Sequence, residues 1–151
     1  MTRRLKIIVL GIGILTFVMS LTQPAFYTSA TNPAGWANSL GLLVFGWSGT
    51  MCGGAGIAWL ANPLIFTSWF YLFRKIKVSV ITGMLAAVFA VSFLLFKNII
   101  TDEAGNYSII TDRKAGYWLW LTSIVIFTIG TAVIYYLEKR SAKKVHDNMN
   151  A

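Results

Sequence analysis

The stretch Gly35–Phe73, GWANSLGLLVFGWSGTMCGGAGIAWLANPLIFTSWFYLF, contains no charged residue and decides the class of fold. Three other apolar runs accompany it, at 5–21, 78–96 and 117–137. A helix needs about 20 apolar residues to cross the hydrocarbon core of a bilayer. Because these runs occupy most of the 151 residues, the sequence predicts an integral membrane protein with a single membrane domain.

The central stretch is too long for one straight crossing. From Trp36 to Phe73 a continuous helix would measure about 57 Å, whereas the hydrocarbon core is about 30 Å thick. Two groups of helix-breaking residues interrupt the stretch: Gly53-Gly54, with Gly56 close behind, and Asn62-Pro63. Proline lacks a backbone N–H and disfavours helical geometry at the residue before it. We therefore expect a broken or extended second segment.

The basic residues after this stretch limit how often it crosses. Two crossings would put Arg74–Lys77 on the same side as the first loop, against the rule that basic segments stay cytoplasmic. We therefore predict one crossing over 40–60, followed by an aromatic helix over 64–73 at the inner interface. The alternative is a re-entrant segment before Gly54 with the crossing after it. Both alternatives keep the number of crossings odd.

The positive charges indicate an orientation for the whole chain. The formal charge is +8, and ten of the thirteen basic residues fall in three clusters, within 3–6, 74–77 and 139–144. This arrangement places both termini, including a tail over 138–151, in the cytoplasm. It explains the basicity through lipid headgroups rather than nucleic acid. The first run also resembles a signal peptide, although we favour a retained anchor.

A repeated sequence between the third and fourth runs predicts a short external hairpin. Ile99–Asp102 and Ile109–Asp112 have similar sequences, and a turn containing Gly-Asn separates them. Short β-branched runs around such a turn are typical of paired strands. The acidic residues Asp102, Glu103 and Asp112 offer oxygen ligands for a hard cation, but we favour a solvated hairpin tip. We predict no metal site and no cofactor.

Small residues recur along the central stretch, and we single them out as a helix-packing seam: Gly46, Gly49, Cys52, Gly53 and Gly56. Small residues four positions apart let helix backbones approach closely in a membrane. The seam therefore predicts either a homodimer face, a narrow solute pathway or packing inside one bundle, and we favour the last. The lone cysteine is interpreted as a packing residue.

Chemistry-bearing residues are scarce inside the four runs. Their interiors hold no Asp, Glu, Arg or His, the residues that mark proton relays and ion pathways within a bilayer. Asn62 and Pro63 form the most unusual pair, which we interpret as a helix break near the inner interface. Such a break can also form a binding site in transporters. No catalytic, cofactor-binding or metal-binding set is predicted.

Three motifs resemble a pattern found in small four-span bacterial inner-membrane proteins. They are Trp59-Leu60-Ala61-Asn62-Pro63, Asp102-Glu103-Ala104-Gly105 and Gly116-Tyr117-Trp118-Leu119-Trp120. The resemblance implies a bacterial inner (plasma) membrane location. It implies no activity and assigns no functional residue.

The sequence thus predicts an all-α, four-helix membrane bundle without enzymatic activity. The expected role is that of an accessory subunit or an immunity-type protein, which acts through helix or loop contacts with a membrane-protein partner or a second copy. The alternative is a small transporter or channel subunit that works as an oligomer. The partner, the substrate and the oligomeric state are left open.

Overall fold

The computed structural model describes residues 2–29, 38–100 and 106–149. Most of these residues are helical. The α-helices are α1 (Thr2–Leu21), α2 (Ser39–Phe45), α3 (Trp47–Met51), α4 (Ala61–Tyr71), α5 (Ile76–Ser92) and α6 (Ala115–Met149). Two 3₁₀-helices, η2 (Gly54–Leu60) and η3 (Phe93–Leu95), and three strands, β1 (Phe26–Thr28), β2 (Asn98–Ile100) and β3 (Tyr107–Arg113), complete the described elements.

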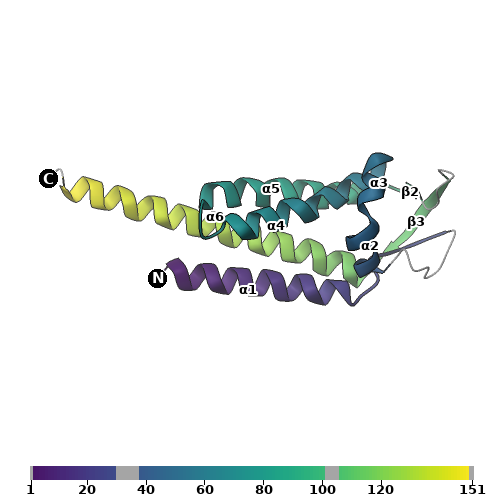
Figure 1. Cartoon of the computed structure of the whole chain (residues 1–151), viewed down its shortest axis with the longest axis horizontal. Helices are drawn as coiled ribbons and strands as arrows, with labels where there is room; N and C mark the ends of the chain where they lie inside the picture. Colours follow the sequence, from purple (N-terminus) through teal and green to yellow (C-terminus); the bar gives the residue numbers. More distant parts are fainter. Residues whose placement is uncertain (1, 30–37, 101–105, 150–151) are drawn as a thin grey trace.

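The long helices lie side by side, and the irregular elements gather at one end of them (Figure 1). Helices α1, α4, α5 and α6 run along the long axis, whereas α2, α3 and the strands lie together at the end that we call the sheet end. The opposite end carries the start of α1, the connection between α4 and α5 and the last part of α6. Because all three basic clusters lie there, we call it the basic end.

Among the described residues, three helices are long and apolar enough to cross a membrane: Thr2–Leu21, Ile76–Leu95 (α5 with η3) and Ala115–Lys143 within α6. Many of their large apolar side chains are exposed on the isolated chain, such as Leu15 (63%), Val88 (66%) and Val133 (52%). Soluble monomers rarely expose contiguous apolar surface on this scale. These outward-facing side chains are compatible with insertion into a membrane.

The central stretch is divided differently from our prediction. A single helix over 40–60 was expected, but α2 and α3 end at Met51, the chain turns, and a new helical run begins at Gly54. That run comprises η2 and α4 without a gap and is about 30 Å long at the usual rises. The segment predicted as an interfacial helix over 64–73 belongs to this run and lies along α5. The chain turns at Gly53–Gly54, the position at which the alternative divided the stretch.

The predicted hairpin is present, and a third strand joins it. Strands β2 and β3 pair antiparallel, with Asn98 opposite Ile109 and Ile100 opposite Tyr107. Strand β1, from the loop after α1, pairs with the other edge of β3, so the strand order is β1-β3-β2. Strand β1 was not predicted from the sequence, and with its three strands the fold is not purely helical.

Helices α1 and α6 approach closely because glycine lies at their contact. A Cβ at Gly130 would lie 2.7 Å from a methyl group of Val9, and one at Gly13 would lie 3.3 Å from the Phe127 Cβ. At the basic end Lys6 Nζ lies 2.8 Å from Glu138 Oε1. Helix α6 also continues to Met149, through the described part of the segment predicted as a tail and well past the start of α1 (Figure 1). The predicted spans 5–21, 78–96 and 117–137 lie largely within α1, α5 and α6, respectively. Helix α6 is much longer than the span predicted for it.

Candidate functional site

At the sheet end, α2 and α3 fold back on η2, and we call these three helices, with the turn before η2, the helical hairpin. Helices α2 and α3 form one arm and η2 forms the other, and glycines lie where the two arms touch. A Cβ at Gly56 would lie 2.0 Å from the carbonyl oxygen of Gly49, so the two backbones touch. A Cβ at Gly46 would lie 2.6 Å from the Trp59 ring. Gly46, Gly49 and Gly56 are therefore contact residues within one chain.

The turn of the hairpin also depends on glycine. Gly53 and Gly54 have φ of 71° and 57°, in the region that side chains with a Cβ rarely adopt. Cys52 is exposed beside this turn. The predicted seam is thus not a single helix face. Its glycines are split between the two arms and the turn of the hairpin.

A tryptophan ties the two arms together. Trp59, on η2, donates its indole N–H to the carbonyl oxygens of Leu42 and Leu43, each at 3.1 Å. The last carbonyls of a short helix lack partners within the helix, and α2 ends at Phe45. The Trp59 indole supplies one of these missing partners from the opposite arm.

Asn62 and Pro63 do not form the predicted break. Both lie within the first turn of α4, where a missing N–H is tolerated, and helical structure continues through them. The change from 3₁₀ to α geometry at Leu60–Ala61 immediately precedes them. The chain turns instead at Gly53–Gly54, at the sheet end rather than at the basic end.

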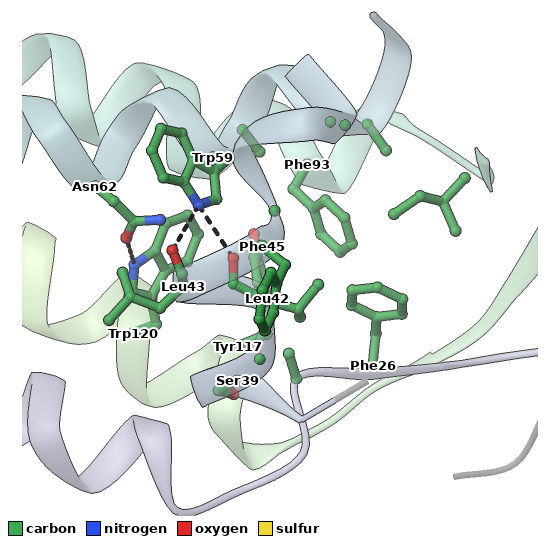
Figure 2. A pocket seen from close by; sticks show the side chains of 18 of the residues that line it. Phe26, Ser39, Leu42, Leu43, Phe45, Trp59, Asn62, Phe93, Tyr117 and Trp120 are labelled. Atoms are coloured by element: carbon green, nitrogen blue, oxygen red, sulfur yellow. Dashed lines mark hydrogen bonds between the residues drawn. The ribbon is translucent and has the colours of Figure 1, made fainter. Parts of the chain in front are cut away.

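A cavity of about 730 Å³ lies between the helical hairpin, the long helices and the sheet (Figure 2). Among the described residues its wall carries no Asp, Glu, Lys, Arg or His. Aromatic side chains contributed by all parts of the sheet end dominate the wall: Phe17, Phe26, Phe45, Trp59, Phe93, Tyr117 and Trp120. Phe93 packs against Phe26 and Tyr117, with ring centroids 5.4 and 5.1 Å apart.

Few polar groups face this cavity, and most of them are paired. The Tyr117 hydroxyl donates to the carbonyl of Ala90 at 3.1 Å, and Ser39 donates to the carbonyl of Gln23 at 2.7 Å. Trp120 donates its indole N–H to Oδ1 of Asn62 at 2.9 Å. The site is therefore suited to uncharged, mainly apolar groups rather than to ions.

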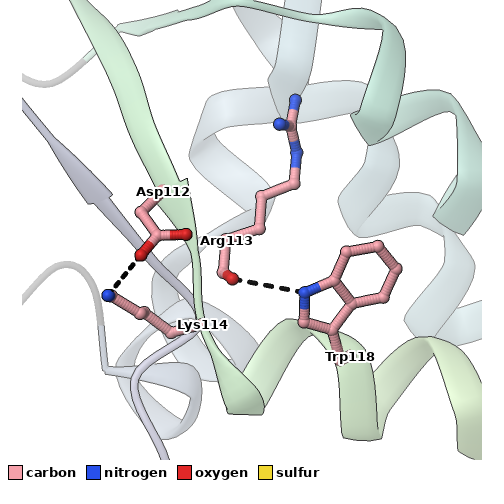
Figure 3. A network of polar contacts seen from close by, with 4 residues as sticks. All are labelled: Asp112, Arg113, Lys114 and Trp118. Carbon is pink, nitrogen blue, oxygen red and sulfur yellow. Dashed lines mark hydrogen bonds and ion pairs between the residues drawn. The ribbon is translucent and has the colours of Figure 1, made fainter.

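Arg113 carries a positive charge that lies away from the basic end, and it binds backbone carbonyl oxygens. Its Nη2 donates to the carbonyl oxygen of Phe96 at 2.9 Å and to that of Leu94 at 3.3 Å. A cation at a helix C-terminus offsets the partial negative charge of the last carbonyls. Its own carbonyl accepts from the Trp118 indole at 3.2 Å (Figure 3), which ties β3 to α6.

The predicted acidic cluster falls only partly on described residues. Asp102 and Glu103 lie outside them, and Asp112 forms an ion pair with Lys114 (Figure 3). The hydrogen bond from Lys114 lowers the pKa of the Asp112 carboxyl, and the same bond raises the pKa of Lys114. The described part of the chain holds no group of three or more metal-ligating residues.

The tryptophans and the tyrosine on the cavity wall were not predicted as site residues from the sequence. Trp59 and Tyr117-Trp118-Leu119-Trp120 were named only in the motifs of the resemblance. The sequence feature that could have indicated these site residues is a tryptophan in the interior of an apolar stretch, close to an asparagine. Comparison with protein-family models, with curated proteins and with solved structures finds no match for this chain.

Proposed function

We propose that the chain is a non-enzymatic protein of the bacterial inner membrane, with four crossings and both termini in the cytoplasm, that acts by binding another molecule at its sheet end. The observation that carries the proposal is the separation of features between the two ends (Figure 1). The basic clusters share one end, and the hairpin, sheet and cavity share the other. The bundle thus presents one plain cytoplasmic end and one elaborated outer end.

The fourth crossing is assigned to η2 and α4 together. Their combined length of about 30 Å equals the thickness of the hydrocarbon core. This assignment takes the chain from Gly54 at the sheet end to Tyr71 at the basic end, so Arg74–Lys77 stays cytoplasmic. The hairpin arm formed by α2 and α3 then enters the outer leaflet and returns without crossing. Its exposed apolar residues, including Val44 and Trp47, suit that position.

An accessory subunit or an immunity-type protein fits this arrangement best. Such a protein needs a shaped outer surface and no reactive groups, and the sheet end offers exposed Tyr107 (70%) and Ile109 (58%) on β3. Exposed aromatic and branched apolar side chains are common anchors in protein interfaces. The proposed partner is a membrane protein or a second copy of this chain.

The test has two parts. Reporter fusions after Lys77 and after Met149 should report a cytoplasmic location, and a fusion within 101–105 an external one. A photo-crosslinking residue in place of Tyr107 should then capture a protein partner or a second copy, whereas one in place of Phe73 at the basic end should not. An external Lys77 fusion would contradict the four-crossing topology. Crosslinking only from Phe73 would contradict binding at the sheet end.

A small transporter or channel subunit is the second candidate, because the cavity lies between helices that we propose to cross the membrane. The absence of Asp, Glu, Lys, Arg and His from the described cavity wall argues against coupling to protons or ions. Uptake of a neutral solute into proteoliposomes would distinguish this candidate from a binding protein.

A further inference from the structure

The cavity wall carries a hydrogen-bond donor without a partner, Nδ2 of Asn62. The Asn62 side chain is 94% buried, and its Oδ1 accepts from Trp120. This bond fixes the orientation of the carboxamide, so Nδ2 lies on the other side of the group. In the described structure Nδ2 makes no hydrogen bond, although Asn62 lines the cavity. An unpaired donor that faces a mainly apolar cavity favours a ligand that accepts a hydrogen bond.

The remaining wall defines the rest of such a ligand. The volume of about 730 Å³ falls within the range of about 300–1,000 Å³ common for small-molecule sites. A charged ligand would lose its hydration without meeting an opposite charge, because the described wall carries no Asp, Glu, Lys, Arg or His. Rings such as those of Trp59, Phe93 and Tyr117 offer flat apolar surfaces. The ligand is therefore neutral and mainly apolar, with an acceptor oxygen.

The rim of the cavity indicates where the ligand comes from. Phe45 lines the cavity and is also 61% exposed. Leu40 and Val44 on the same short helix are about half exposed as well. An apolar rim of this kind connects the cavity with surrounding lipid rather than with water, given the membrane position in the proposed function.

We propose that the cavity binds a neutral, membrane-dissolved lipid that carries a carbonyl oxygen. The carbonyl accepts the hydrogen bond from Nδ2 of Asn62, and the apolar body lies against Trp59, Phe93 and Tyr117. Two kinds of membrane lipid share this chemistry, the acyl ester of a diacylglycerol and the ring carbonyl of an isoprenoid quinone. The proposal rests on the proposed membrane topology but does not require a protein partner.

Matched probes test the hydrogen bond directly. The purified full chain in detergent is titrated with 2-tridecanone and with tridecane, which differ by one carbonyl, and the thermal unfolding midpoint yields each affinity. We expect the ketone to bind roughly 2- to 12-fold more tightly, as one net hydrogen bond provides. Asn62→Leu should abolish this preference. Ser68→Ala, on the same helix but outside the cavity wall, should preserve it.

A cavity-filling variant guards against loss of folding in the asparagine variant. Ala58→Leu leaves Asn62 in place, and because Ala58 lines the cavity, the larger side chain should weaken both probes. Decyl-ubiquinone and dioctanoylglycerol then distinguish the two lipid sources, and tighter binding of either one supports the proposal. Equal affinity of the wild type for ketone and alkane would overturn it, since water would then satisfy Asn62. Absent binding of every probe, with reporter fusions as expected, would also overturn it while leaving the proposed function intact.

Discussion

Gly56→Ala should open the helical hairpin, although it adds a single methyl group. The new Cβ would lie 2.0 Å from the carbonyl oxygen of Gly49 and 2.5 Å from its carbonyl carbon. Both atoms are backbone, so no side-chain rotation relieves the clash, and α3 must move away from η2. The partner glycine provides a matched control. A Cβ at Gly49 would meet only the Gly56 Cα, at an ordinary 3.7 Å.

Compared with the wild type, Gly56→Ala should therefore be less stable, whereas Gly49→Ala should be equally stable or more stable. Overpacking typically lowers the free energy of unfolding by about 1–3 kcal/mol. For a chain of this length that corresponds to a fall of roughly 2–12 °C in the thermal midpoint. Gly49→Ala adds no clash and lies within α3, where alanine favours helix over glycine by up to about 1 kcal/mol. Its midpoint should remain unchanged or rise.

Thermal unfolding of the purified chain in one detergent, followed by tryptophan fluorescence, measures this difference. The indole of Trp59 bridges the two arms, so its emission should also shift in Gly56→Ala at temperatures below the midpoint. Equal midpoints for the two alanine variants would show that η2 and α3 do not touch as described. The assignment of these glycines to a contact within one chain would then fail.

Four other substitutions test three separate parts of the structure. Gly53→Ala should lower the free energy of unfolding by about 1–3 kcal/mol, because φ is 71° and ψ is −154° there, and thermal unfolding measures the loss. Ser68→Ala and Ser79→Ala should each lower it by about 0.6 kcal/mol and show coupling in a double-mutant cycle, since each hydroxyl donates to the other residue's carbonyl, at 2.5 and 2.8 Å. For Asp112, whose pKa is lowered chiefly by its hydrogen bond from Lys114, any contribution to stability is present above the ordinary carboxyl pKa and lost as the pH falls through the lowered value. Asp112→Asn should remove that part of the acid dependence, and thermal midpoints compared at pH 6 and pH 3 should then differ less than in the wild type.

Local sequence was sufficient for the features that depend on composition along a single segment. The apolar runs near 5–21, 78–96 and 117–137 predicted three long apolar helices, because hydropathy over about 20 residues is a property of the segment itself. The repeated Ile-Ile-Thr-Asp runs predicted the pairing of β2 with β3, because a hairpin forms between neighbours in the chain. The positions of the basic residues predicted which ends of these helices lie together.

Only the tertiary structure decided where the central stretch turns and what surrounds the turn. Gly53–Gly54 and Asn62–Pro63 are both strong local breakers, and nothing adjacent to them ranks one above the other. The contact of Gly56 with the Gly49 backbone, and the bonds from Trp59 to carbonyls 16 and 17 residues earlier, hold the chain folded at the glycines. Strand β1 and the cavity likewise arise from segments far apart in sequence, whose pairing depends on packing that no local pattern records.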